Sequence, residues 1–423
     1  MLLKRFTKFA RDTWVILGIA LAMFVALEMI VSLGFYIRGF WHPPAADFRI
    51  KADTYTDSQW ASNYYKEIEE IEKGRTLRWQ SYVYWRRTPR RAQYINIDSD
   101  GLRKTINSPV SEGAAPPIRV FMFGGSTMWG LGAADDSTIP SIFAREAKNR
   151  GINCEVVNFG QYAYVSTQEV IELALQLQKG NIPDVVIFHD GVNDTFSGFQ
   201  LSVPGLPHDE IRREKEFCLL ERKELQSLAA LSAVRQLSTI RLLNGVLQKS
   251  GLRRDTVQPI PLGYEKAISD KNSLAHAVVE TYVNNIKLTQ ALSQSYGFTP
   301  LFYWQPVIYT KGHLTEYERQ SLELDVHYPG MKEFYLDTYA VLRQRSSELS
   351  KNAAFNDISS IFSDVREPIF VDFNHMGDKG NGFIARRMAD DFVSRMKANT
   401  APLVRGKALA RGKGPEATAK AGW

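Results

Sequence analysis

A continuous apolar run near the N-terminus is the longest hydrophobic feature of the chain. Residues 14–37 hold one formal charge, at Glu28. At about 1.5 Å per residue, a helix of this length crosses a hydrocarbon core about 30 Å thick. The run exceeds the roughly 7–15 apolar residues of a secretory signal. The pattern therefore predicts an uncleaved transmembrane helix over 14–37, with a cleaved signal or a core helix as the other interpretations.

Basic residues precede this run and set its expected orientation. Residues 1–13 contain four basic side chains and one acidic side chain. The positive-inside rule places such a segment in the cytoplasm. We therefore expect membrane lipid as a partner of the helix, and a periplasmic or extracellular location for everything that follows it.

Two features inside the run bear on contacts with other helices. Gly18, Ala22 and Ala26 form a stripe of small residues that would allow homo- or hetero-association through the span, although small residues are common in any membrane helix. A carboxyl group is costly inside hydrocarbon. We expect Glu28 to be protonated or paired with another chain.

Residues 38–116 predict a linker followed by an N-terminal extension. Pro43 and Pro44 lie among small and polar residues over 42–57, which is typical of a linker. A short helix is predicted at 58–73, and a strand-rich segment at 77–100. Four arginines between residues 86 and 91 would bind an anion or, in the interpretation that we favour, form a solvated face paired with glutamates of the short helix.

From residue 117 to 397, short apolar strands alternate with amphipathic helices. Strands are predicted at 118–123, 156–159, 185–188, 300–304 and 368–371, and helices at 137–149, 166–178, 264–296, 331–350 and 378–396. Buried apolar runs separated by helices are typical of parallel strands covered on both faces. The pattern predicts one α/β domain with a parallel sheet. A helical insert at about 195–297 would form either a lid or an elaboration of the scaffold.

Polar motifs follow the first three predicted strands, at the edge where parallel α/β folds bind ligands. Gly124-Gly125-Ser126 places a serine at a strand-to-helix turn, with an exposed hydroxyl and an amide at a helix N-terminus. Gly160 lets a backbone amide approach a ligand closely. The Asn193 side chain is able to donate to a developing negative charge. Each motif alone is equally typical of an ordinary turn.

A fourth motif comes just before the last predicted helix. Asp372 precedes His375 by three residues, a spacing at which the carboxylate can orient the imidazole and fix its tautomer. The phosphate-loop and dinucleotide-binding glycine patterns are both absent. His189 and Asp190 have no matching second cluster of ligands, so we expect neither a metal nor a cofactor.

Taken in order along the chain, Ser126, Gly160, Asn193 and His375 resemble the four blocks of the SGNH hydrolases, also called the GDSL esterase and lipase superfamily. The resemblance covers roughly residues 117–397. Gly191–Asp194 and Asp372–His375 match two family blocks, whereas Gly125 stands where the family usually has aspartate.

The resemblance implies a flavodoxin-like three-layer α/β/α fold with a five-stranded parallel sheet. It also implies Ser126 as nucleophile, His375 as base and Asp372 as the residue that orients it. An oxyanion hole would be formed by the amides of Ser126 and Gly160 and the side chain of Asn193. Further expected pocket residues are Gly125, Trp129, Asp190 and Asp194, with Trp129 either lining the pocket or filling the core.

The implied activity is hydrolysis of acyl esters, with acetyl as the expected acyl group. The predicted anchor and export suggest an acylated envelope or extracellular polysaccharide as substrate. The same acyl-enzyme would also support O-acyl transfer to a glycan hydroxyl. A third interpretation is a glycan-binding or assembly component that does not turn over.

Charge and composition narrow the partners further. The chain has 423 residues and a formal charge of +6. The excess of basic residues lies at the two ends, in residues 1–13 and in a basic tail at 398–423 that we expect to be disordered. The body between them is nearly neutral, which removes the main argument for nucleic acid. Two cysteines exclude a disulfide framework.

Overall fold

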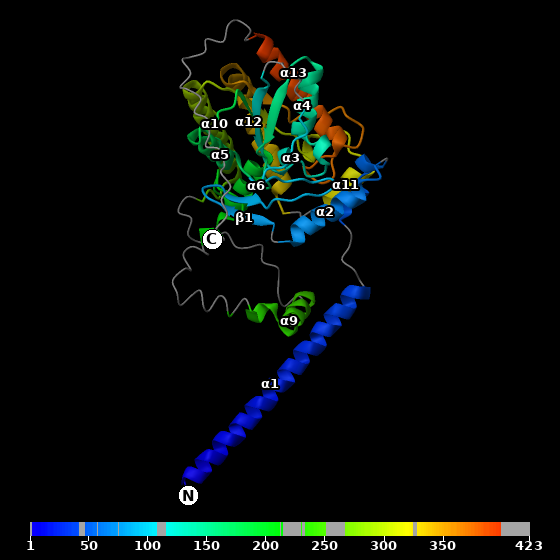
Figure 1. Cartoon of the computed structure of the whole chain (residues 1–423), viewed down its shortest axis with the longest axis vertical. Coiled ribbons are helices and arrows are strands. Elements are labelled where there is room, and N and C mark those ends of the chain that lie inside the picture. Colours follow the sequence, from blue (N-terminus) through cyan, green and yellow to red (C-terminus); the bar gives the residue numbers. More distant parts are fainter. Residues whose placement is uncertain are drawn as a thin grey trace. The chain divides into compact units, whose positions relative to one another are not determined.

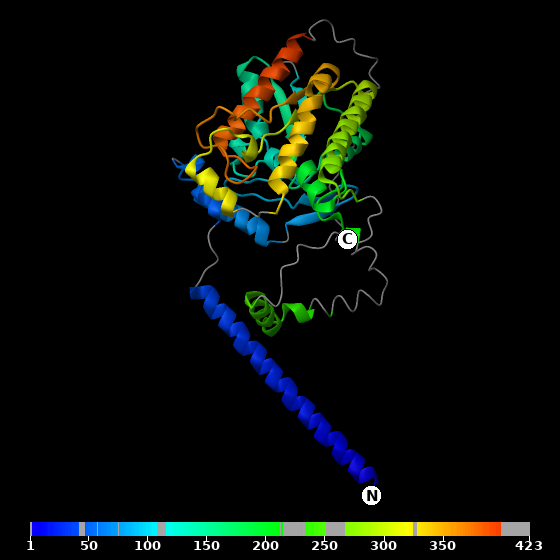
Figure 2. The same ribbon diagram turned by 180° about the vertical axis from the view of Figure 1, so that it is seen from behind.

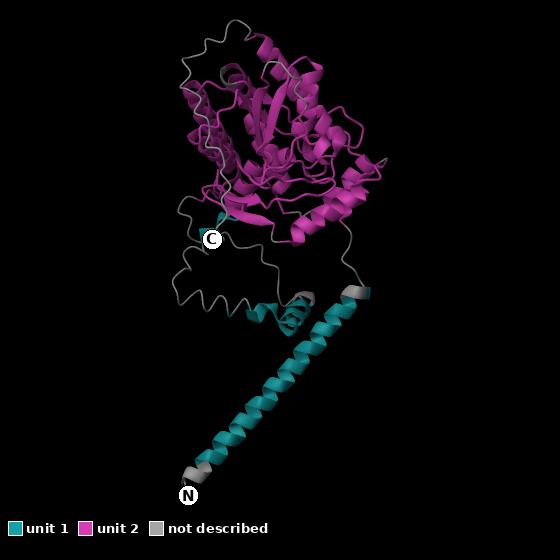
Figure 3. Ribbon diagram, viewed as in Figure 1, with its two compact units in different colours: residues 1–46, 209–263 teal, residues 47–208, 264–423 magenta. Residues whose placement is uncertain are grey.

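The computed structural model describes most of the chain as two compact units. The described residues are 2–41, 47–56, 58–74, 76–107, 116–211, 213–214, 230, 233–250, 267–324 and 328–398. One unit comprises residues 1–46 and 209–263, and the other comprises residues 47–208 and 264–423 (Figure 3). Beyond residue 398, the predicted disordered tail lies outside the described residues.

A five-stranded parallel sheet forms the centre of the larger unit (Figure 1). Its strands are β3 (Ile118–Gly124), β4 (Cys154–Asn158), β5 (Val185–Asp190), β6 (Thr299–Trp304) and β7 (Phe355–Asp357). They are hydrogen-bonded in the order β4-β3-β5-β6-β7. This order is the flavodoxin-like one, in which the first strand pairs with both the second and the third. The predicted fold class is confirmed.

Helices cover both faces of the sheet, as a parallel sheet requires (Figure 2). One face carries α4 (Ile139–Asn149) and α13 (Asp378–Ala398). The other carries α5 (Ser166–Gln178), α6 (Val192–Leu201), α10 (Lys271–Tyr296) and α12 (Met331–Ala353). The resulting three layers match the architecture that the family resemblance implied.

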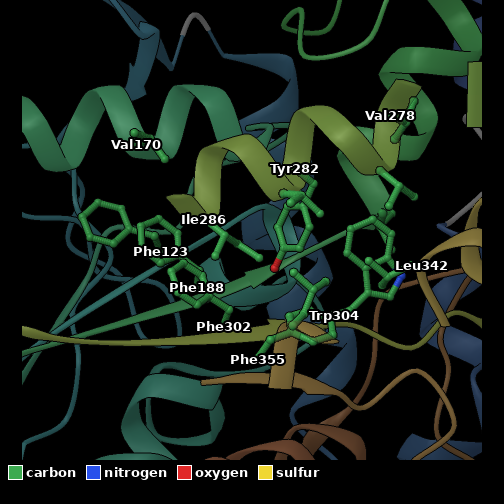
Figure 4. Close-up of a cluster of buried hydrophobic side chains, with 14 of the residues drawn as sticks. Phe123, Val170, Phe188, Val278, Tyr282, Ile286, Phe302, Trp304, Leu342 and Phe355 are labelled. Carbon is green, nitrogen blue, oxygen red and sulfur yellow. The ribbon is translucent and has the colours of Figure 1, made fainter. Parts of the chain in front are cut away.

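Strand side chains alternate between these two helical layers. In β5, Val186 and Phe188 lie in the core below α10 and α12, whereas Val185 and Ile187 lie in the core below α4 and α13. Figure 4 shows the first of these cores, where Tyr282 of α10 lies close to strand aromatics. Burying each such side chain contributes about 1.5–3 kcal/mol.

The predicted strand at 368–371 is wrong, and the fifth strand is β7 instead. Phe370 forms only an isolated bridge with Met376, and the amide of Val371 donates to the carbonyl of His375. The segment is apolar because Ile369, Phe370 and Val371 are buried where the chain enters a tight turn. β7 escaped prediction because it has three residues, of which only Phe355 is buried and apolar.

The helical insert predicted at 195–297 is not one structural element. α6 and α10, which lie at its two ends, pack against the sheet as part of the scaffold. Residues 209–263 belong to the other unit, where α9 (Ser238–Lys249) is described. Residues 215–229 and 251–266 lie outside the described residues.

The predicted linker at 42–57 is wrong from residue 47 onward. Two short 3₁₀ helices, Phe48–Lys51 and Asp53–Tyr55, pack with α2 (Ala61–Lys73) in a third core that includes Tyr55. A hairpin of β1 (Leu77–Gln80) and β2 (Tyr84–Arg87) completes the extension. The segment escaped prediction because its buried residues are few and lack a regular period.

The expected solvated arginine face is also wrong for its first two members. Arg86 is buried and forms an ion pair with Glu172 at 2.5 Å. Arg87 is buried with its guanidinium 4.3 Å from the centre of the Tyr162 ring. Arg90 does pair with Glu70 of α2, at 2.6 Å.

The smaller unit contains α1 (Leu2–Trp41), whose segment Phe6–Arg38 is long and apolar enough to cross a membrane. The Glu28 carboxylate accepts hydrogen bonds from the amides of Ser238 and Thr239 at the start of α9. Its partner is therefore part of the same chain, and the expected pairing with another chain is not what the structure shows.

Arg103 joins the N-terminal extension to the segment that follows β3, and it gives a stability prediction. Its side chain is fully buried, bonds Asp135 at 2.9 Å, and donates to the carbonyls of Gly130 and Ala133 at 2.6 Å each. Arg103→Met leaves the Asp135 carboxylate buried without its cation. We expect the free energy of unfolding to fall by about 3–5 kcal/mol, measured by urea unfolding of the detergent-solubilised chain.

The matched control is Arg145→Met, since Arg145 is exposed and donates a single hydrogen bond of 3.3 Å. Its effect should stay within about 0.5 kcal/mol. Equal stability of the two variants would contradict a structural role for Arg103.

Candidate active site

Ser126 stands at the carboxyl end of β3, where the chain turns directly into α3 (Ser126–Trp129). The amide of Trp129 donates to the carbonyl of Gly125, so the turn is closed by the first helical bond. A side chain at position 125 would displace the Asn193 amide, since its Cβ would lie 2.0 Å from Nδ2 of Asn193. Glycine at position 125 therefore leaves room for the Asn193 amide beside the serine turn.

His375 and Asp372 lie in a tight turn that precedes α13. Oδ1 of Asp372 accepts hydrogen bonds from the amides of Asn374 at 3.1 Å and His375 at 2.7 Å. An aspartate that bonds its own backbone two or three residues on stabilises such a turn. The bridge between Phe370 and Met376 closes the turn from outside. The local sequence thus fixes the backbone from which the imidazole projects.

The structure brings Ser126, His375 and Asp372 together, although the serine and the histidine are separated by 249 residues. Oγ of Ser126 lies 2.7 Å from Nε2 of His375, and Nδ1 of His375 lies 2.7 Å from Oδ2 of Asp372. An ionised carboxylate only accepts hydrogen bonds, so it places the imidazole proton on Nδ1. Nε2 is then free to accept the hydroxyl proton of Ser126.

Asp372 is held in its ionised form. Burial alone would raise its pKa, but the charge and hydrogen bonds of His375 and the charge of Arg49 outweigh burial and hold the pKa well below its usual range. Nη1 of Arg49 lies 3.8 Å from Oδ2 of Asp372, and both side chains are largely buried. The carboxylate therefore stays charged whenever the imidazole needs an acceptor.

Arg49 is the residue of this site that the sequence did not reveal. It lies in a segment predicted to be a linker, more than three hundred residues before Asp372. In the structure its guanidinium also pairs with Asp47 at 2.6 Å and lies 5.4 Å from the centre of the Tyr65 ring. Only the neighbouring opposite charges of Asp47 and Arg49 were visible in the sequence, and they point to no distant partner.

The expected oxyanion donors lie beside the serine turn. Gly160 packs so closely that an added Cβ would lie 2.4 Å from the amide nitrogen of Trp129. The Gly160 amide donates to Oδ1 of Asn158 at 2.9 Å, and Nδ2 of Asn193 donates to the carbonyl of Tyr164 at 2.8 Å. The second N–H of Asn193 is not engaged by that bond. The amide of Ser126 is in the first turn of α3, where amides have no intrahelical partner.

Three of the expected pocket residues are internal. Trp129 is fully buried beneath Arg103 and fills the core, which settles the choice between its two interpretations. Asp194 accepts hydrogen bonds from the amide and hydroxyl of Ser166 at 3.1 and 2.6 Å. Asp190 is buried against Glu169, and burial followed by their mutual interaction raises the pKa of Glu169.

Within the part of the chain that the structure describes, no three histidine, cysteine, aspartate or glutamate side chains form a group able to hold a metal ion. His189 is completely buried, and burial lowers its pKa to about 3. It is a neutral core residue rather than part of the site.

Comparison with known proteins gives matches among solved structures only: no family model and no curated protein matches the chain. A GDSL-family lipolytic protein from Veillonella parvula has 11% identity and a TM-score of 0.36, covering 67% of this chain and 100% of that one. The acetyl xylan esterase AlAXEase has 14% identity and a TM-score of 0.32, covering 66% and 99%. A catalytic mutant of an acetylxylan esterase from Geobacillus stearothermophilus has 12% identity and a TM-score of 0.33, covering 65% and 93%.

Arg49 gives a prediction about the reactivity of Ser126. In Arg49→Met, Asp372 loses a neighbouring positive charge that helps to hold its pKa low, so the carboxylate takes up a proton more readily as the pH falls. The acid limb of the labelling rate with a serine-reactive fluorophosphonate should therefore move to higher pH, by roughly one unit. At a pH on that limb, labelling should slow about tenfold.

Arg49→Lys is the matched control, because it keeps the positive charge but not the planar guanidinium. Its acid limb should stay near that of the original chain. An unshifted profile in Arg49→Met, with circular dichroism unchanged, would show that Arg49 does not act on the Asp372–His375 pair.

Proposed function

We propose that the protein is a serine ester hydrolase that acts through Ser126, His375 and Asp372. The proposal rests on two hydrogen bonds in series. The serine hydroxyl lies 2.7 Å from one nitrogen of the imidazole, and the other nitrogen lies 2.7 Å from the buried carboxylate. Nucleophile, base and orienting acid within hydrogen-bond reach are the arrangement by which a serine is activated.

The reaction begins when Nε2 of His375 takes the proton of the Ser126 hydroxyl. Oγ attacks the acyl carbonyl, and a tetrahedral intermediate forms. Asp372 stabilises the imidazolium that results and does not itself accept the proton. The imidazolium then protonates the leaving alkoxide, and the acyl group remains on Ser126. A water molecule, deprotonated by His375, then attacks the acyl carbonyl, and the imidazolium returns the proton to Oγ of Ser126 as the acyl–Oγ bond breaks and the carboxylic acid leaves.

The oxyanion of the intermediate requires donors next to the serine turn. The Ser126 amide and the second N–H of Asn193 are the first two proposed donors, supported by the Nδ2 atom of Asn193, which lies 2.0 Å from where a Cβ at position 125 would be. The Gly160 amide is the third proposed donor, and it would exchange its bond to Asn158 for one to the oxyanion. Each such donor contributes about 2.7–4 kcal/mol to catalysis.

An acylated glycan of the cell envelope or extracellular matrix is the proposed substrate, with acetyl as the acyl group. The support is the apolar helix Phe6–Arg38, which would anchor the chain in a membrane. The basic residues before it would remain in the cytoplasm, leaving the catalytic unit on the opposite side. Two of the solved structures that match the chain are of acetyl xylan esterases.

Replacement of the nucleophile tests the activity. Ser126→Ala should lower kcat/KM for 4-nitrophenyl acetate by at least about 10³-fold, because no other group takes the acyl group. The exposed Ser360 provides the control, and Ser360→Ala should leave the rate unchanged. Full activity in Ser126→Ala would overturn the assignment.

The fate of the acyl group distinguishes hydrolysis from transfer. With an acetylated oligosaccharide and a second, unacetylated one, a hydrolase releases free acetate. A product in which the acetyl group appears on the second oligosaccharide would instead identify an O-acyltransferase that uses the same three residues.

The contact between Gly125 and Asn193 gives a further prediction. Gly125→Ala should displace the Asn193 amide, since the added Cβ would lie 2.0 Å from Nδ2. Gly125→Ala and Asn193→Ala should each lower kcat by about 10²–10³-fold. If both act through one lost donor, the double variant should be little worse than either single variant. Strictly multiplicative losses would show that Gly125 acts independently of Asn193.

A further inference from the structure

α9 is fixed to α1 by the one carboxylate within the apolar run. Glu28 accepts a hydrogen bond from the amide of Ser238, another from the amide of Thr239 at 3.0 Å, and a third from the Thr239 hydroxyl at 2.8 Å. The first amides of a helix have no intrahelical partner, and the positive end of the helix dipole favours an anion there. The start of α9 therefore supplies hydrogen-bond donors and a positive potential to a carboxylate that stands alone in an apolar run.

Two further contacts continue along the same stripe of α1. The hydroxyls of Ser32 and Ser238 lie 2.7 Å apart, and the guanidinium of Arg241 lies 5.0 Å from the centre of the Phe35 ring. Residues 28, 32 and 35 are four and three positions apart, so they share one face of α1. The contacts run toward the Arg38 end of the helix.

These contacts fix the depth of α9 relative to the apolar run. Glu28 precedes Arg38, where the apolar segment ends, by ten residues. At about 1.5 Å per residue, Glu28 lies about 15 Å inside that end. A hydrocarbon core is about 30 Å thick, so with Arg38 at its boundary Glu28 lies near the middle. The first turn of α9 must lie at the same depth as the carboxylate that it binds.

Three large apolar side chains of α9 are exposed, beside the exposed Arg241. Leu242, Leu243 and Val246 are 48%, 54% and 56% exposed. Such a cluster on a helix whose first turn lies at hydrocarbon depth matches acyl chains and not water. Arg241 lies beside Phe35, near the end of the run, where a long basic side chain can extend to the headgroups.

We infer that α9 is a second membrane-embedded segment, which enters the non-cytoplasmic leaflet and is held there by Glu28. Its partner is the acyl-chain region of the bilayer, contacted by Leu242, Leu243 and Val246. The inference rests on the proposed membrane anchor, and it gives Glu28 a role independent of the ester chemistry. The chain would then enter the membrane twice, once by the span and once by re-entry.

Depth-dependent quenching in proteoliposomes tests this inference. Leu243→Cys in the full chain, with Cys218→Ser and with the buried Cys154 retained, is labelled with an NBD fluorophore. The vesicles contain phosphatidylcholine and phosphatidylglycerol, with or without doxyl groups on the acyl chains. Leu21→Cys on α1 and the exposed Lys66→Cys on α2 serve as the membrane and solvent references.

The expected result is that the label at 243 is quenched to the extent seen at 21, whereas the label at 66 is not quenched. Adding Glu28→Leu should bring quenching at 243 down to the level at 66 and leave position 21 unchanged. Hydrolysis of a soluble ester should be unaffected by Glu28→Leu. If Glu28→Leu does not insert into the vesicles, Ser238→Pro and Thr239→Val replace it in the test. They remove the Ser238 amide and the Thr239 hydroxyl, both of which donate to Glu28. Proline is tolerated at the first helical position.

Three outcomes would overturn the inference. Quenching at 21 without quenching at 243 would place α9 outside the bilayer while leaving the anchor intact. Absence of quenching at both positions would remove the proposed anchor itself. Pyrene attached at position 243 would show excimer emission, lost on dilution with unlabelled chain, if a second copy of the chain contacted this side of α9 in place of lipid.

Discussion

The buried carboxylate of Asp372 is the group on which the proposed chemistry depends. One oxygen binds the amides of the turn that carries His375, and the other binds the imidazole. The same carboxylate receives the charge of Arg49 from the N-terminal extension. A single ionised group thus fixes the backbone, the imidazole orientation and the contact with a segment far away in the sequence.

The parallel sheet explains why the site can form at all. Its strands place Ser126, Gly160 and Asn193 at one edge, because all of them follow the carboxyl ends of adjacent strands. Close packing at this edge requires glycine at 125 and 160, where a Cβ would collide with Asn193 and with the Trp129 amide. Asp372 and His375 reach the same edge from the turn before α13, so the geometry comes from the whole fold and not from one motif.

Much of this arrangement was predictable because it follows from periodicity and local chemistry. Four of the five strands, the layer helices and the Asp372–His375 turn all carry short-range signals in the sequence. Arg49 did not, since no spacing rule relates residue 49 to residue 372. β7 was too short to show a pattern, and the apolar residues at 369–371 are buried where the chain enters a turn instead of in a sheet. The partner of Glu28 was equally hidden, because it lies about 210 residues away.

The central claim is that Ser126 carries the acyl group during turnover. The most direct measurement is the intact mass of the chain after brief reaction with a 4-nitrophenyl carbamate, whose acyl-enzyme hydrolyses slowly, followed by peptide mapping. The account predicts one carbamoyl adduct per chain, located on Ser126 and formed in step with release of 4-nitrophenol. Release of 4-nitrophenol without an adduct, or with an adduct on another residue, would contradict it.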